Sequence, residues 1–161
     1  MYLFSVLLLS LLLPAGSAWA EHSYFHSAVP LGTLAVQWFV FWASGARLTI
    51  AGLRQQLRPR LTSQGIFGIA GDDPLPFVRE LGVANLANGL IALLSLWRPD
   101  FLLPAAVSAT VFYTLAGIWH IFHGHMTFNR VVALVSDLLL GAAFGWIAFT
   151  MFANGGVSLV L

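Results

Sequence analysis

The sequence predicts an all-α membrane protein: a bundle of five transmembrane helices, or four if the first segment is a cleaved signal peptide. Composition is the first reason, because 59% of the 161 residues are hydrophobic and only 8% are charged, against about 25% in an ordinary soluble domain. The second is a series of five apolar stretches, each close to the roughly 20 residues that a helix needs to cross a bilayer. A water-soluble fold of this size could not cover so much apolar surface.

The first apolar segment, residues 3–20, has two interpretations. It ends in PAGSAWAE, in which a proline and a glycine disfavour a continued helix and AWA resembles the small-x-small site of a signal peptidase. Only Met and Tyr precede the apolar core, however, so the basic residues that normally begin a signal peptide are missing. Residues 1–20 are therefore either a first transmembrane helix or a signal peptide, and 21–161 form a single membrane-embedded bundle.

The other four predicted helices cover residues 31–53, 81–97, 102–122 and 131–152. The helix at 81–97 is short for a membrane span, and Phe77 and Val78 could extend it through the interface. The segments between these predicted helices are loops, and only the loop at 54–80 is long.

The distribution of arginine predicts the orientation. Arginines gather in and around the 54–80 loop and at the start of the last helix, whereas Arg98 stands alone on the other side. By the positive-inside rule the 54–80 loop and the 124–130 turn are cytoplasmic, while 21–30, 98–101 and the C-terminus face out.

The 54–80 loop is too small to fold around a core of its own, so we expect an interfacial cap. The sequence DDP that begins at Asp72 is typical of a helix N-cap followed by proline in the first turn. It would start the helix that carries Arg79 and Glu80. Capping accounts for the adjacent carboxylates, and a divalent-ion site is the alternative.

Five polar residues interrupt the predicted helices: Arg47, Asn85, Asn88, His120 and Asp137. An Arg or Asp near the membrane centre costs about 2.5–3.5 kcal/mol, so such residues turn inward and find partners. Helix rise places Arg47 and Asp137 both about 10 Å inside the cytoplasmic boundary, and the other three at about 8–12 Å. We predict a buried ion pair between Arg47 and Asp137, with the asparagines, which share a helix face, and His120 hydrogen-bonded around it.

This polar layer has a structural and a functional interpretation. It could join the helices, helped by small residues that allow close approach, namely Gly45, Gly52, Gly82, Gly89, Gly117, Gly141 and Gly145. Alternatively, it could line a cavity open to the cytoplasm that binds an ion, a proton or a small solute. Aromatic residues that would suit an amphipathic ligand are Trp38, Trp42, Phe112, Tyr113 and Trp119.

Three histidines, His120, His123 and His125, lie in the sequence LAGIWHIFHGHMTFNR at 115–130. The first two share a helix face and could bind one metal ion together with the third. Haem is less well supported, because no obvious second ligand faces them across the bundle. The simpler interpretation is that polar side chains and Gly124 end a helix there. We therefore expect no cofactor, with a metal or haem at these histidines as the alternative.

Several classes of function are excluded or disfavoured. The chain has no cysteine, which rules out thiol chemistry and zinc-thiolate sites, and its formal net charge of +1 offers no footprint for nucleic acid. The sequence contains no serine-nucleophile elbow, zincin motif or phosphate-binding loop, so we expect that the protein is not an enzyme.

The chain resembles the bacterial DUF6790 family of small multi-helix membrane proteins, whose function is not established. The resemblance spans 38–137 and rests on WFVFWASGARLTIAGLRQ (38–55), IFGI (66–69), VRELGVANLANGLIALLSL (78–96), LAGIWHIFHGH and the SD at 136–137. It implies that the family motif includes Arg47, Arg79, Glu80, Gly82, Asn85, His120 and Asp137. More distantly, the chain is similar to DoxX-like four-helix membrane proteins, some of which are partners of redox systems.

Together these observations predict a multi-pass protein of a bacterial inner membrane, surrounded by lipid and possessing no enzymatic activity. The leading expectation is an accessory or scaffold subunit that binds other membrane proteins. The alternatives are a small-solute, ion or proton carrier that uses the polar layer as its site, and a histidine-based metal or haem protein. A carrier should contain a hydrated cavity that reaches Arg47, whereas a scaffold should keep that layer dry.

Overall fold

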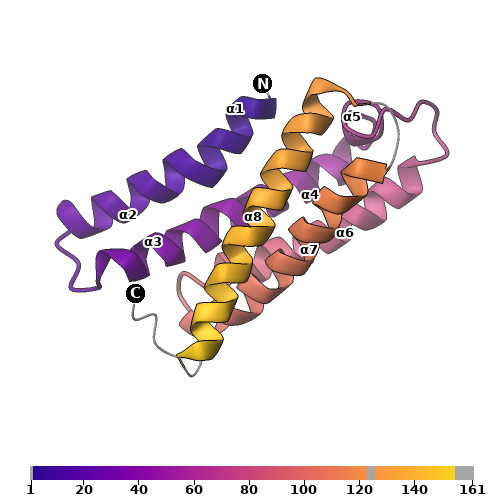
Figure 1. Ribbon diagram of the computed structural model, residues 1–161. Helices are drawn as coiled ribbons and strands as arrows, with labels where there is room; N and C mark the ends of the chain where they lie inside the picture. The colour runs from indigo at the N-terminus through magenta and orange to yellow at the C-terminus, as the bar shows by residue number, and fades with distance from the viewer. Residues whose placement is uncertain (1, 123–125, 155–161) are drawn as a thin grey trace.

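The computed structural model describes residues 2–122 and 126–154, and that part of the chain is helical and contains no strand. Five helical rods are long and apolar enough to cross a membrane: Tyr2–Ser23, Leu31–Leu57, Leu75–Leu94, Pro99–Phe122 and Phe128–Ala153. Figure 1 shows them running up and down beside one another. The five-helix prediction is confirmed.

The rods are built from the following elements. The first contains α1 (Tyr2–Leu7), the π-helical η1 (Leu8–Leu12) and α2 (Leu13–Ser23), and the second contains α3 (Leu31–Phe39), the π-helical η2 (Val40–Ala46) and α4 (Arg47–Leu57). Then follow α5 (Arg60–Ser63), α6 (Leu75–Leu94), the short η3 (Pro99–Phe101), α7 (Leu102–Phe122) and α8 (Phe128–Ala153). Helix α6 begins earlier than 81, because Phe77 and Val78 continue it to Leu75.

The first rod stays helical through Pro14. Proline lacks an N–H group, and its ring clashes with the carbonyl four residues earlier, which normally breaks a helix. Here the turn Leu8–Leu12 is π-helical, and the Leu13 N–H donates to the Leu8 carbonyl, five residues back. The wider turn accommodates the proline, so the break expected at this point does not occur.

Polar contacts join the first two rods along their length. The indole Nε1 of Trp38 donates to Glu21 at 2.7 Å, and that of Trp42 donates to Ser17 at 3.0 Å. One turn further along, Arg47 Nη1 lies 3.5 Å from Ser10 Oγ. The interval from Trp42 to Arg47 crosses η2, where hydrogen bonds close over five residues rather than four, so both side chains reach the first rod.

These contacts predict that the first rod is kept in the mature protein. Removal of residues 1–20 would take away Ser10 and Ser17, leaving a guanidinium and an indole N–H without these partners inside the bundle. Intact-mass spectrometry of protein purified from membranes should therefore give the mass of a chain that still contains residues 1–20. A mass lower by that segment would show that it is a signal peptide.

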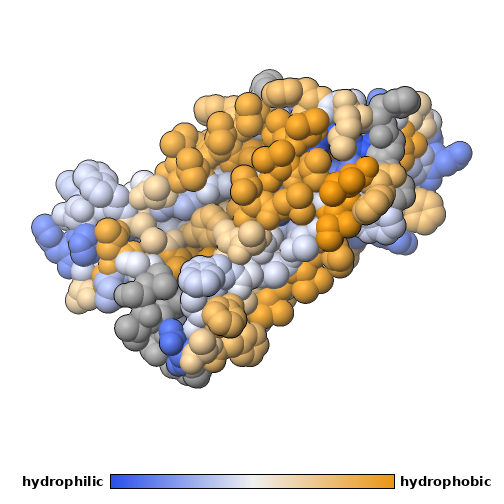
Figure 2. Space-filling view, in the orientation of Figure 1, coloured by the Kyte–Doolittle hydropathy of each residue, from blue (hydrophilic) through white to orange (hydrophobic). Residues whose placement is uncertain are grey.

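The outer surface is suited to lipid. Figure 2 shows apolar side chains over the middle of the molecule and hydrophilic ones at its two ends. On α8, for example, Leu139, Trp146, Phe149 and Phe152 are each more than 60% exposed. Exposed apolar side chains in this number are unfavourable in water, and together with the five candidate spans they indicate a multi-pass membrane protein.

Inside the bundle, the most extensive packing joins α4 to α6 and α7 to α8. Aromatic rings fill the centre between the second, fourth and fifth rods, with Phe144 lying 5.0 Å from Phe39 and stacked 5.8 Å from Tyr113 between ring centroids.

The 57–75 connection forms the cap at the arginine-rich end (Figure 1). Its Asp72 carboxylate accepts hydrogen bonds from Arg60 Nε at 3.1 Å and Nη2 at 2.7 Å. The N-cap of α6 is instead Pro74, and no side chain caps this helix. The prediction that Asp72 and Asp73 cap this helix is therefore wrong. The Asp72 carboxylate is hydrogen-bonded to Arg60 instead of to the backbone N–H groups of the first turn of α6.

Candidate functional site

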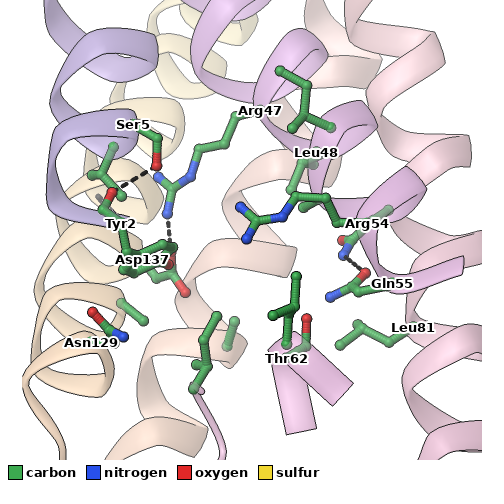
Figure 3. A pocket seen from close by; sticks show the side chains of 18 of the residues that line it. Tyr2, Ser5, Arg47, Leu48, Arg54, Gln55, Thr62, Leu81, Asn129 and Asp137 are labelled. Carbon is green, nitrogen blue, oxygen red and sulfur yellow. Dashed lines mark hydrogen bonds and ion pairs between the residues drawn. The ribbon is translucent and has the colours of Figure 1, made fainter. Parts of the chain in front are cut away.

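The predicted ion pair lies between the second and fifth rods. Arg47 Nη2 is 2.9 Å from Asp137 Oδ1, and both side chains are about nine-tenths buried. The same nitrogen donates to Ser136 Oγ at 3.0 Å. Figure 3 shows the guanidinium turned toward Asp137. The matched depths of the two residues thus predicted their pairing correctly, because helices that place opposite charges in one layer can bring them together.

An aromatic ring completes the surroundings of Arg47. The guanidinium carbon lies 5.1 Å from the centroid of the Tyr113 ring, within cation–π range. Tyr113 is fixed in turn by its hydroxyl, which donates to the Ala43 carbonyl at 2.7 Å. Arg47 is therefore held by a carboxylate, two hydroxyls and a ring, and its position is set by three different rods.

His120 lies beside the ion pair without a hydrogen bond to it. Its Nε2 is 3.7 Å from Asp137 Oδ2, which is too long for a hydrogen bond, so this part of the prediction is wrong. The backbone explains the placement: Arg130 Nε donates to the His120 carbonyl at 3.2 Å, which holds the last turns of α7 against α8. Arg130 is 2% exposed, although the sequence suggested a boundary residue.

The side chains of the two asparagines of α6 contact different helices. Asn85 Nδ2 donates to Gln55 Oε1 of α4 at 2.7 Å, and Asn85 Oδ1 is buried with no hydrogen-bond partner among the described residues. Asn88 faces α7 instead, where its Oδ1 accepts from Ser108 and its Nδ2 donates to the Ala84 carbonyl. The prediction that Asn88 joins the polar layer is wrong, because residues three apart point roughly 60° apart, enough to face different neighbours.

The other predicted site residues lie elsewhere or cannot be placed. Arg79 and Glu80 are exposed near the start of α6, where the Arg79 carbonyl accepts from Gln56 at 2.5 Å, and neither lines the cavity described next. His123 and His125 lie outside the described residues. Within the described ranges no group of three or more His, Cys, Asp or Glu side chains could hold a metal, so the three-histidine metal site stays a prediction.

A cavity of about 240 Å³ opens next to the ion pair at the arginine-rich end. Its polar lining residues are Tyr2, Ser5, Arg47, Arg54, Gln55, Thr62, Asn85, Tyr113, His120, Asn129 and Asp137. Apolar side chains from all the rods and from the cap complete the wall. In Figure 3 the guanidinium groups of Arg47 and Arg54 point into the same space. The volume can hold several water molecules or one small organic solute.

The charges of the described lining residues do not cancel. Arg47 and Arg54 each carry a positive charge, whereas Asp137 is the single carboxylate in the wall. Asp137 is paired with Arg47, so the charge of Arg54 is left over. Arg54 makes no ion pair with any residue that the structure describes. The cavity therefore has an excess positive charge.

Arg54 and Gln55 line the cavity although neither was predicted from the sequence to be a site residue. Gln55 lies eight residues after Arg47, which places it on the same broad face of the second rod, and this spacing could have identified it. Arg54 carried no such signal, because an arginine at the end of a transmembrane helix usually extends into the lipid headgroups. Arg54 is exposed, and it becomes a lining residue because α5 and the following turn lie across this end of the bundle.

Comparison with known proteins returns one family. The model described as "Family of unknown function (DUF6790)" matches residues 1–155, a wider range than the 38–137 covered by the recognisable motifs. The match includes the first rod. No curated protein and no solved structure matches the chain.

Proposed function

The chain belongs to the DUF6790 family, whose function is unknown, and we propose that it binds a small solute in the cavity beside the Arg47–Asp137 pair. The observation that carries this proposal is the cavity itself, which reaches the ion pair from the arginine-rich end. A polar layer that served only to join helices would be closed by its own side chains. This layer leaves a space of about 240 Å³ beside it.

The hydrogen bonding of the wall also supports a bound solute. The buried Asn85 Oδ1 has no partner among the described residues, and an orphaned buried acceptor costs about 1–3 kcal/mol. Asp137 Oδ2 and His120 Nε2 lie too far apart to satisfy each other. A water molecule or a solute between Asp137 Oδ2 and His120 Nε2 would hydrogen-bond to both atoms.

We place the protein in the inner membrane of a bacterium, with the arginine-rich end and the cavity mouth at the cytoplasm, and we propose that it works without a cofactor and without catalysis. Solute binding there suits a carrier. The apolar outer faces do not favour a scaffold over a carrier, since lipid alone requires them. The cavity is therefore the feature that makes a solute-binding role the better of the two.

Cysteine labelling tests whether the cavity is open to water. The chain contains no cysteine, so a single introduced thiol is the only reactive one. Ala133 lines the cavity and Ala106 lies in the dry core, and these alanines are 2% and 0% exposed. We expect a small water-soluble methanethiosulfonate to label Ala133→Cys at least about tenfold faster than Ala106→Cys, because the reagent needs an accessible thiolate.

The measurement is the rate of labelling, read by mass spectrometry, in membrane vesicles of known orientation. Ala106→Cys is the matched control, since it makes the same change at an equally buried site in a neighbouring helix. Equal, slow labelling of both variants would show that the cavity is closed and would overturn the proposed function. Fast labelling of Ala133→Cys from the opposite side would overturn the orientation.

A further inference from the structure

We propose that the ligand of this cavity is a small organic anion of the carboxylate type, held by Arg54. The inference rests on the proposed function, because it names the class of solute that the same cavity takes. It goes further by assigning the binding charge to Arg54 and not to the buried Arg47.

Electrostatics favours an anion. The charges of Arg47 and Asp137 neutralise each other at 2.9 Å, which leaves the Arg54 guanidinium as the uncompensated charge of the described wall. Arg54 is exposed at the open side of the cavity, so its charge can attract an anion from water into the space that it lines. A cationic solute would meet Arg54 with no free carboxylate to offset it.

The geometry of Arg54 suits a carboxylate. A guanidinium offers a planar fork of N–H donors that matches the two oxygens of a carboxylate, and such bidentate contacts are stronger than neutral hydrogen bonds. Figure 3 shows the Arg54 guanidinium turned into the cavity, with no dashed contact to another side chain. The donor groups are therefore positioned but not used by the protein.

The rest of the wall favours an organic rather than an inorganic anion. Leu9, Leu48, Phe112 and Ala116 are among the apolar residues that line the cavity, and each lies at least one helical turn further from the arginine-rich end than Tyr2, Arg54 or His120 on the same rod. A short hydrocarbon chain can replace water against these side chains, at about 0.8 kcal/mol per buried CH₂ group, whereas phosphate or chloride cannot. A solute with a carboxylate at the mouth and a short apolar chain inside matches both halves of the cavity.

The first test compares reagents of opposite charge on Ala133→Cys. We expect the anionic sulfonatoethyl methanethiosulfonate to react at least about fivefold faster, relative to its rate with a free thiol, than the cationic trimethylammonium analogue. Arg54→Gln should abolish this preference. Arg58→Gln is the matched control, because Arg58 follows directly after α4, is exposed as Arg54 is, and does not line the cavity.

The second test measures protection of Ala133→Cys by butyrate and by butylammonium, two solutes of equal chain length and opposite charge. Butyrate should slow labelling by a neutral reagent, butylammonium should not, and Arg54→Gln should raise the butyrate concentration required by at least about tenfold. Arg58→Gln should leave that concentration unchanged.

The outcomes separate the two proposals. If Ala133→Cys reacts rapidly but butylammonium protects as well as butyrate, or Arg54→Gln behaves like Arg58→Gln, the anion assignment is overturned while the open cavity stands. If inorganic phosphate protects as well as butyrate, the organic part of the assignment is overturned. If Ala133→Cys does not react at all, the cavity and its function fall together.

Discussion

Replacement of Asp137 by alanine is expected to lower the free energy of unfolding by about 3–5 kcal/mol. The change leaves the Arg47 guanidinium buried between three rods with only hydroxyl and aromatic neighbours. A buried charge without its counter-ion loses the attraction that offset its desolvation, and the loss is larger than the net value of the pair itself. The loss should appear as a lower midpoint of thermal or denaturant unfolding in detergent micelles.

Two further variants make this prediction specific. Asp100→Ala removes an exposed carboxylate whose nearest arginine contact is 3.8 Å long, so it should change stability by less than about 1 kcal/mol. Adding Arg47→Met to Asp137→Ala should recover part of the loss, because the stranded charge is then removed as well. If Asp137→Ala and Asp137→Arg were both as stable as the natural protein, the pair would not support the fold.

Replacement of Gly89 by alanine is expected to destabilise the protein by about 2–3 kcal/mol, although the side chain added is a single methyl group. A Cβ at Gly89 would lie 2.7 Å from the backbone nitrogen of Thr49 and 3.0 Å from the Gly45 carbonyl oxygen. Backbone atoms cannot move aside as a flexible side chain can, so α6 and the second rod must separate. Close contact through small residues is a main source of helix association in membranes, where the hydrophobic effect does not favour it.

Gly145→Ala is the control for this second variant. A Cβ there would meet Thr110 Cγ2 at 3.4 Å, an ordinary van der Waals distance, so stability should be nearly unchanged. Unfolding midpoints of the two variants in the same detergent give the comparison. Equal midpoints would show that the approach of α6 to the second rod is not tight.

Variants that destabilise the bundle can be distinguished from a variant that changes only ligand binding. Asp137 and Gly89 support the bundle, and we expect their variants to lose binding only because the fold weakens. Arg54 has no such structural partner among the described residues, so Arg54→Gln should alter ligand binding while the unfolding midpoint stays within about 0.5 kcal/mol of the natural protein. Stability and binding can therefore be measured separately in this chain.

Residue order was enough to predict the class of protein, the five apolar segments that form long helices, and the Arg47–Asp137 pair, although it left open whether the first segment is cleaved. The physical reason is that hydropathy decides which segments enter lipid, and a rise of about 1.5 Å per residue decides how deep each polar residue lies. Depth is a property of one helix at a time. It could therefore be derived for Arg47 and Asp137 without knowledge of their neighbours, and the pairing followed from the cost of leaving either charge alone.

Only the tertiary structure decided which way each side chain faces. Rotation about a helix axis depends on the packing of neighbours, which turned Asn85 toward α4 and Asn88 toward α7. The π-helical turns η1 and η2 shift that rotation further; Pro14 follows η1, but no residue of the sequence indicates η2. The cavity and the role of Arg54 depend on where the cap lies across the bundle, and such a position is set by contacts between distant segments and not by any local pattern.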